Sequence, residues 1–159
     1  MLDFCIRAAG PDDIDGARAV MLDTVYRDFR TGYVPHWHGD IIDPAAAYLD
    51  PARHTLLVAL DPADGAVVAT AALDSRGPLH PPNSRELAAR YPSGETAQLR
   101  RVYVRPEHRR RGLARHLVAD LLTFAAADGG YRGRQRFRRT RAGPVLAAGE
   151  WPKLAVHPA

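Results

Sequence analysis

Apolar and polar residues follow two different periods along this chain, and the periods separate predicted helices from predicted strands. Two apolar runs, TLLVAL (55–60) and AVVATAAL (66–73), flank the loop DPADG and predict an antiparallel hairpin. After a short predicted strand at residues 4–7, helical spacing predicts a helix with Asp12 as its N-cap. The buried stripe of that helix consists of Ile14, Ala17, Met21 and Val25. Weaker patterns predict one helical turn and one short helix, at residues 45–49 and 86–90.

The predicted strand AQLRRVYV breaks its own alternation. Its first large apolar residue, Leu99, is out of phase by one position with the two valines that follow, Val102 and Val104. A β-bulge near residues 100–101 would restore the phase and bend the strand. Arg101 and Tyr103 would then share the face opposite the valines.

The next segment, RPEHRRRGLARHLVADLL, predicts a loop followed by a long helix from Gly112 to about Asp128. Gly112 tolerates unusual dihedrals and lets a ligand approach the main chain, and Ala114 keeps the first turn free of bulk. Three arginines precede this helix, although a helix dipole repels cations at its N-terminus. Because free N–H groups at a helix N-terminus bind anions, a pyrophosphate guest would make these arginines favourable.

Length and composition exclude several classes of protein. A chain of 159 residues, 46% hydrophobic and 25% charged, is typical of one globular domain. No apolar run approaches the roughly 20 residues of a membrane span, and the N-terminus lacks the apolar core of a signal peptide. Cys5 is the only cysteine, which excludes an intrachain disulfide and a thiolate-rich metal site. We therefore expect a soluble, cytoplasmic protein with no membrane partner.

The net charge of +4 is concentrated at the C-terminus. Residues 1–131 contain 15 arginines and 17 acidic residues, whereas residues 132–159 contain seven basic residues and Glu150 alone. Arginine stands at every second position from 132 to 138, and neither face of such a segment suits a central strand. We interpret residues 132–159 as a basic tail, either a disordered arm or the product of a shifted reading frame, and predict no C-terminal strand there.

Residues 3–131 resemble the GNAT-type acetyltransferases. The acetyl-CoA signature of that family, Arg/Gln-x-x-Gly-x-Gly/Ala between a strand and a long helix, is matched by Arg109, Gly112 and Ala114. The bulged strand, the hairpin and the N-terminal strand–helix unit also fit. The resemblance implies an α/β fold with a mixed, mainly antiparallel sheet flanked by helices. It further implies that acetyl-CoA is the cosubstrate, and that a primary amine attacks it directly without a metal.

The same resemblance implies the residues that bind acetyl-CoA. The pyrophosphate would lie against the loop Arg109, Arg110, Arg111, Gly112, Leu113 and Ala114. The backbone of Val102 and Val104 would pair with the pantetheine arm, which places the thioester near the bulge, where N–H groups can polarise its carbonyl.

Candidates for the acceptor site and for proton transfer are less defined. The segment YVPHWHGD contains Tyr33, Trp37 and His38, which either line the acceptor site or, for Trp37, anchor the loop. His36 and His38 lack a third ligand at metal-binding spacing. Glu95 and Tyr103 are candidates to assist proton transfer. Since no tyrosine follows Tyr131, the acid that family members often use to protonate the CoA thiolate has no counterpart.

Two other functions remain open at this point: a CoA-binding relic that has lost catalysis, and a nucleic-acid-binding protein that uses the two arginine clusters. A nucleic-acid partner is not expected, because the arginine run before Gly112 is better explained by a pyrophosphate. The acceptor is a small-molecule or peptide amine of unknown identity, and a homodimer stays open.

Overall fold

A six-stranded sheet forms the centre of the molecule. The computed structural model describes residues 3–81, 83–93, 96–127, 136–140 and 143–147. Within those ranges every pairing between neighbouring strands is antiparallel. The strands follow one another across the sheet as β1 (Cys5–Ala8), β2 (Thr55–Leu60), β3 (Val67–Asp74), β4 (Thr96–Val104), β6 (Gly143–Ala147) and β5 (Arg136–Thr140). The predicted mainly antiparallel sheet and the hairpin β2–β3 are confirmed.

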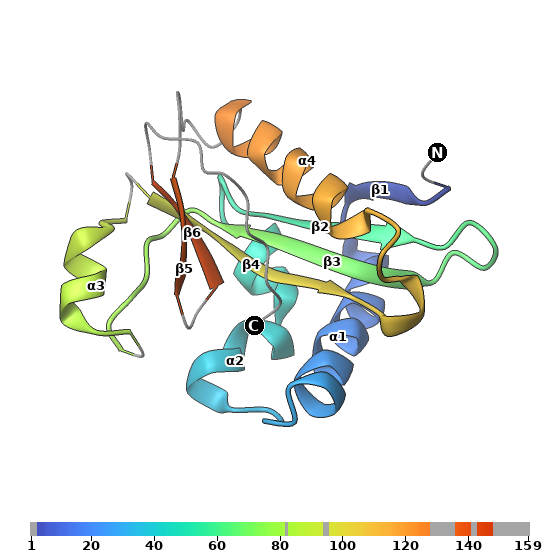
Figure 1. The fold of residues 1–159 in the computed structure, drawn as a ribbon, viewed down its shortest axis with the longest axis horizontal. Coiled ribbons are helices and arrows are strands. Elements are labelled where there is room, and N and C mark those ends of the chain that lie inside the picture. Colours follow the sequence, from blue (N-terminus) through green and yellow to red (C-terminus); the bar gives the residue numbers. More distant parts are fainter. Residues whose placement is uncertain (1–2, 82, 94–95, 128–135, 141–142, 148–159) are drawn as a thin grey trace.

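Helices cover both faces of this sheet (Figure 1). One face carries the long helix α4 (Leu113–Ala127), and the other carries α1 (Ile14–Asp23) and α2 (Pro35–Ile42). The short helix α3 (Arg85–Arg90) lies beyond the end of the sheet where β4 begins. Shorter helical turns occupy residues 11–13, 24–28, 45–49 and 106–108. In the described part of the chain, no helix combines the length and the apolar character needed to cross a bilayer.

Two apolar cores result from this layering. Leu113, Leu117 and Leu121 of α4 pack on one face of the sheet, and Val20, Met21 and Ile41 pack on the other. Every residue of β3 is buried, because helices cover both of its faces. This double burial explains why β3 reads as a continuous apolar run rather than as an alternating strand.

Two local predictions near the N-terminus are wrong. Asp12 does not cap α1, because a 3-10 turn over residues 11–13 precedes the helix. Asp13 fixes that turn instead: its carboxylate accepts a hydrogen bond from the backbone N–H of Gly10 at 2.8 Å and pairs with Arg7 at 2.6 Å. The sequence pattern predicts no helix over residues 35–42, yet this segment forms α2, which is kinked at His38.

The prediction that the tail contributes no strand is also wrong. Strands β5 and β6 form a hairpin, and β6 pairs with residues 96–98 of β4. The arginine-rich strand β5 takes the edge of the sheet, while the apolar sequence GPVLA lies between it and β4. The physical argument against a central strand therefore holds for β5, but it does not exclude an edge strand, where one ladder of hydrogen bonds suffices. The domain boundary near residue 131 stays a prediction.

Candidate active site

The bulge in β4 organises the candidate site. The pairing of β3 with β4 slips between Thr70 and Ala72, so that two residues of β4, Arg101 and Val102, oppose Ala71. Arg101 has a φ of 53°, a left-handed conformation that is uncommon for a residue with a side chain. The buried Thr70 hydroxyl donates a hydrogen bond to the Arg101 carbonyl at 2.8 Å, which replaces a lost ladder bond. The predicted bulge is confirmed, one residue further along the strand.

The bulge restores the phase of β4 as predicted. Leu99, Val102 and Val104 all pack into the core beneath α4, and Tyr103 packs into the opposite core. Arg101 donates a hydrogen bond to the Tyr103 hydroxyl at 3.1 Å, so these two residues share a face. Successive residues of a regular strand point to opposite faces, but the bulge interrupts this alternation between Arg100 and Val102. The guanidinium groups of Arg100 and Arg101 therefore both reach the side of the sheet that faces α2.

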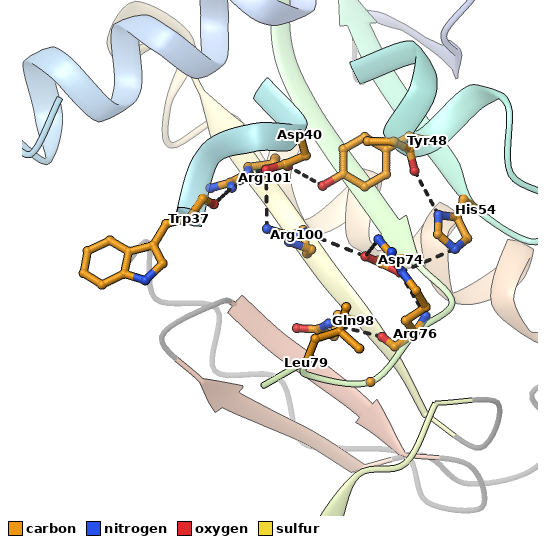
Figure 2. A network of polar contacts seen from close by, with 12 residues as sticks. Trp37, Asp40, Tyr48, His54, Asp74, Arg76, Leu79, Gln98, Arg100 and Arg101 are labelled. Carbon is orange, nitrogen blue, oxygen red and sulfur yellow. Dashed lines mark hydrogen bonds and ion pairs between the residues drawn. The ribbon is translucent and has the colours of Figure 1, made fainter. Parts of the chain in front are cut away.

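The carboxylate of Asp40, on α2, forms ion pairs with both Arg100 and Arg101 (Figure 2). It accepts hydrogen bonds from Arg101 at 2.6 and 2.7 Å and from the Tyr48 hydroxyl at 2.5 Å. Arg100 approaches it less closely, at 3.4 Å. A further bond from Arg101 to the Trp37 carbonyl, at 2.6 Å, joins the first turn of α2 to the bulge.

These contacts fix the charge states of the cluster. Burial would raise the pKa of Asp40, but the hydrogen bonds and positive charge of the two arginines outweigh it and lower that pKa to about 2. Burial raises the pKa of Tyr48 well above its usual value, so its hydroxyl stays protonated and donates. Burial would lower the pKa of Arg101, but the hydrogen bonds and charge of Asp40 raise it. A carboxylate and a guanidinium therefore meet at the bulge at any neutral pH.

A second buried carboxylate lies at the end of β3. Asp74 accepts two hydrogen bonds from the Arg76 guanidinium, at 2.8 and 2.9 Å, and one from the Arg76 backbone N–H. The His54 Nε2 atom lies 3.4 Å from the Asp74 carboxylate, and an Arg100 nitrogen lies 3.7 Å from it. Arg100 thus stands between two carboxylates, at a long distance from each (Figure 2).

A pocket of about 540 Å³ lies beside these charged side chains. Asp74, Arg76, Arg100 and Arg101 line one part of it, together with Gln98, and these residues form its charged wall; its apolar lining includes Trp37 and Leu79. Trp37 is 42% exposed and Leu79 is 45% exposed, so two large apolar side chains remain open to solvent around a polar pocket. Apolar surface beside convergent polar groups is typical of a small-molecule site.

Two polar atoms in this wall lack a hydrogen-bond partner among the described residues. Gln98, only 4% exposed, donates its amide N–H to the Arg76 carbonyl at 3.1 Å, but its Oε1 atom accepts nothing. The buried Nε of Arg100 likewise donates to nothing. Both atoms are buried from solvent, so a ligand in the pocket would not reach them, and each carries the cost of an unsatisfied polar group.

Of the three residues predicted for the acceptor site, two line the pocket. Trp37 and His38 line the pocket, whereas Tyr33 is not among its described lining residues and packs against the His38 ring, 6.0 Å between centroids. The His38 Nδ1 atom accepts a hydrogen bond from the Val34 backbone N–H at 2.8 Å. Burial, followed by the positive charge of Arg101, lowers the pKa of His38, so the ring is neutral and carries its proton on Nε2.

The loop before α4 contains two residues in left-handed backbone conformation. Arg110 has a φ of 61° and Gly112 a φ of 79°. The first hydrogen bond of α4 runs from the His116 N–H to the Gly112 carbonyl at 3.1 Å. The N–H groups of the three residues between them therefore have no partner inside the helix, as at any helix N-terminus.

The signature side chains have separate contacts. Arg109 donates to the Val104 carbonyl at 2.8 Å and pairs with Asp28. The Arg111 guanidinium lies 4.6 Å from the centre of the Phe4 ring. Leu113 is buried in the core, so only its backbone could meet a ligand. Val102 and Val104 lie on β4 beyond residues 96–98, which are the residues of β4 that pair with β6.

Of the two candidates for proton transfer, the described part of the chain includes only Tyr103. Tyr103 is half-buried against Phe29, with ring centroids 5.6 Å apart, and does not line the pocket among the described residues. Glu95 lies outside the described residues, so its role stays a prediction. In the described part of the chain, no group of three or more potential metal ligands occurs.

Sequence reasoning missed most of the charged wall. Asp74, Arg76, Gln98 and Arg100 were not proposed as site residues. A usable signal existed in β4, where the polar residues Gln98 and Arg100 alternate with the apolar residues Ala97 and Leu99. Polar residues on the covered face of an inner strand require partners, and here the partners are other side chains or a ligand.

Comparisons with known proteins address the family and the fold. A family model described as the Acetyltransferase (GNAT) family matches residues 21–135. A search of curated proteins finds no significant match. Among solved structures, a GNAT-family acetyltransferase from Staphylococcus aureus is 12% identical with a TM-score of 0.58, covering 76% of this chain and 65% of its own. The chain thus spans less than two thirds of that protein.

Two further structures are similar. A GCN5-related N-acetyltransferase from Kribbella flavida is 20% identical with a TM-score of 0.57, covering 86% of this chain and 71% of its own. Glucosamine-6-phosphate N-acetyltransferase from Arabidopsis thaliana is 14% identical with a TM-score of 0.52, covering 78% and 75%. At these identities the likeness establishes the fold alone. Since the family model covers most of the chain, including the bulged strand and the loop before α4, this protein belongs to the GNAT acetyltransferase family.

Proposed function

We propose that this protein transfers an acetyl group from acetyl-CoA to an amine. The observation that carries the proposal is the loop between β4 and α4. Arg110 and Gly112 both adopt positive φ there, and they lead into a helix whose first N–H groups lack intrahelical partners. Consecutive N–H groups at a helix N-terminus form an anion site, and the pyrophosphate of CoA carries the required charge.

The free edge of β4 supports the position of the pantetheine arm. Strand β6 pairs with residues 96–98 only, so the rest of that edge, residues 99–104, pairs with no described strand on that side. The amide groups of pantetheine can pair with the backbone of Val102 and Val104, although the Val104 carbonyl already accepts one bond from Arg109. An arm on this edge carries the thioester toward the bulge and the pocket.

The reaction on such a complex needs few protein groups. The amine nitrogen attacks the thioester carbon, a C–N bond forms, and the C–S bond breaks to release the CoA thiolate. N–H groups at the bulge would stabilise the negative charge that develops on the carbonyl oxygen. The amine loses one proton and the thiolate gains one, so no external reactant is consumed.

The described pocket supplies one imidazole that is free to accept the amine proton. His38 is committed through Nδ1 to the Val34 N–H, and both oxygens of Asp74 are engaged by Arg76. His36 also lines the pocket; its ring packs against Trp37, at 5.1 Å between centroids, and within the described part of the chain no hydrogen bond engages it. We assign His36 as the proton acceptor on this basis, with Glu95 as the remaining candidate.

A calorimetric titration with acetyl-CoA tests the binding step, and release of free CoA with an amine panel tests the transfer. We expect a single CoA site whose affinity changes little between roughly 50 and 200 mM salt, since the contacts are a preorganised loop. A steep loss of binding with salt would indicate phosphate-backbone binding instead. CoA binding without transfer to any amine would indicate a catalytically inactive family member, and no CoA binding would refute the proposal.

A further inference from the structure

The charged wall of the pocket indicates which amine the protein accepts; this inference rests on the acetyl transfer proposed above. We propose that the acceptor is an amine bearing a carboxylate near its nitrogen, as in an amino acid, and that Arg100 binds this carboxylate. Three separate observations support the assignment.

The first observation is the balance of charge. Among the described residues that line the pocket, three guanidinium groups face one carboxylate: Arg76, Arg100 and Arg101 against Asp74. Asp40, which holds Arg101 from α2, adds a second carboxylate and leaves one positive charge in excess. An excess positive charge in a partly buried pocket attracts an anion and repels a polycation such as a polyamine.

The second observation is that Arg100 is the least engaged of the three. Arg101 and Arg76 hold their aspartates at 2.6–2.9 Å, but Arg100 lies 3.4 Å from Asp40 and 3.7 Å from Asp74. Its Nε is buried and donates no hydrogen bond. Among the described residues its terminal nitrogens, Nη1 and Nη2, have only these long contacts with carboxylates, so a substrate carboxylate that came closer would form the stronger arginine–carboxylate pair.

The third observation is the position of Arg100 along β4. It directly precedes the bulge at Arg101–Val102, where the thioester is expected. One residue of strand advances the chain by roughly 3.3 Å. Arg100 is thus the pocket arginine that directly precedes the expected position of the thioester, which favours an acceptor whose carboxylate lies near its amine.

The apolar lining completes the description of the acceptor. Trp37 and Leu79 line the same pocket and are both largely exposed. An acceptor with an apolar side chain would cover them, whereas its carboxylate and amine would face the charged wall. Phenylalanine has all three features and serves as the probe.

The experiment compares matched acceptors on the full chain. CoA release is measured with phenylalanine, with its carboxamide, with phenethylamine, and with spermidine as a polycation. Phosphoethanolamine and ethanolamine form a second pair that distinguishes a phosphate from a carboxylate. We expect phenylalanine to have a kcat/KM at least tenfold above its carboxamide and phenethylamine, and we expect spermidine to be the poorest acceptor.

Two arginine variants distinguish a direct contact between Arg100 and the carboxylate of the acceptor from a general electrostatic effect of positive charge. Arg100→Gln should raise the KM for phenylalanine by roughly 10- to 100-fold, the loss of one hydrogen bond to a charged group, and should leave the KM for phenethylamine unchanged. Asp74 keeps Arg76 and Asp40 keeps Arg101 in this variant, so it should fold. Arg90→Gln is the matched control, because Arg90 lies on α3, is half-exposed and, among the described residues, forms an ion pair with the exposed Glu86 alone.

Each outcome decides the proposal. Equal use of phenylalanine and phenethylamine by the unaltered protein would overturn it, and so would equal effects of Arg100→Gln and Arg90→Gln. A preference confined to phosphoethanolamine would overturn the carboxylate assignment. If acetyl-CoA binds but no amine is acetylated, calorimetry of phenylalanine against the CoA-loaded protein replaces the kinetic test: binding that Arg100→Gln abolishes supports the site, and no binding refutes it.

Discussion

Replacing Gly112 by valine is the most direct test of the loop before α4, because the structure provides its own control. Gly112 has a φ of 79°, and Gly65, in the β2–β3 turn, has a φ of 72°. A valine at either position must adopt a left-handed conformation. A Cβ at Gly65 would meet no atom within 4 Å, so strain is the only cost there. The two variants thus share the conformational penalty and differ in their distance from the proposed CoA site.

The expected effects differ in kind. A left-handed conformation costs a residue with a side chain roughly 1–2 kcal/mol, which lowers the melting temperature of a domain of this size by about 2–8 °C in both variants. Only Gly112→Val also places a branched side chain where the CoA pyrophosphate would approach the backbone. Losing one hydrogen bond to a charged group costs roughly 1.5–3 kcal/mol, which weakens acetyl-CoA binding about 10- to 150-fold.

Thermal denaturation and calorimetry with acetyl-CoA measure the two effects separately. Gly65→Val should bind acetyl-CoA like the unaltered protein, and Gly112→Val should remain folded but bind weakly. Unchanged affinity in a folded Gly112→Val protein would refute the assignment of the pyrophosphate site. An equal loss of affinity in both variants would show that binding follows stability and not the local contact.

Other changes test the remaining parts of the site. The pKa of Asp40 lies near 2 in the folded state, below its unfolded value of about 3.9, so its contribution of roughly 2 kcal/mol is present above pH 4 and is lost as the pH falls through 2. The variant Asp40→Asn should lose that pH dependence in denaturation measured over a range of pH. Its free energy of unfolding at pH 7 should fall by several kcal/mol, because Arg101 stays buried without its carboxylate partner. Unchanged stability of this variant would refute the structural role of the Asp40–Arg101 ion pair. Trp37→Ala should raise the KM of the acceptor without weakening acetyl-CoA binding, since the ring is exposed and the backbone carbonyl makes the bond to Arg101; global unfolding would instead indicate an anchor. Limited trypsin digestion should spare the bonds after Arg138 and Arg139, which lie within the ladder of β5, and rapid cleavage there would contradict the hairpin.

The sequence predicted those elements whose signal is local. The apolar runs of β2 and β3, the helical stripe of α4 and the phase break after Leu99 each lie within a few residues, so periodicity was sufficient. The helix α2 was missed because its pattern is interrupted: proline opens it, Gly39 lies near its centre, and the chain kinks at His38. A broken period in eight residues cannot be distinguished from a loop.

The charged wall could not be predicted for a different reason. Arg101 meets Asp40 across a separation of 61 residues, and Arg100 and Asp74 come together only because β3 and β4 pair. Nothing local identifies which of the chain's 22 basic residues will be buried. The hairpin β5–β6 was missed for the same reason. The arginine-rich strand β5 is compatible with the sheet only at its edge, and that position depends on β6 pairing between it and β4.

The arginines illustrate how far composition alone can mislead. A run of three before a helix appears to be one basic patch that opposes the helix dipole. In the structure, Arg109 turns to Asp28 and to the Val104 carbonyl, and Arg111 lies over the Phe4 ring. Arg110 takes a left-handed conformation next to Gly112. Two of the three side chains therefore brace the loop, and the anion site itself belongs to the backbone N–H groups that the loop exposes. Arg100 and Arg101 are basic residues of another kind: both are largely buried, Arg101 is held closely by Asp40, and Arg100 lies at longer distances from Asp40 and Asp74. A nucleic acid would need these charges on one open surface, whereas a small anionic acceptor and a pyrophosphate each need only the group that faces them.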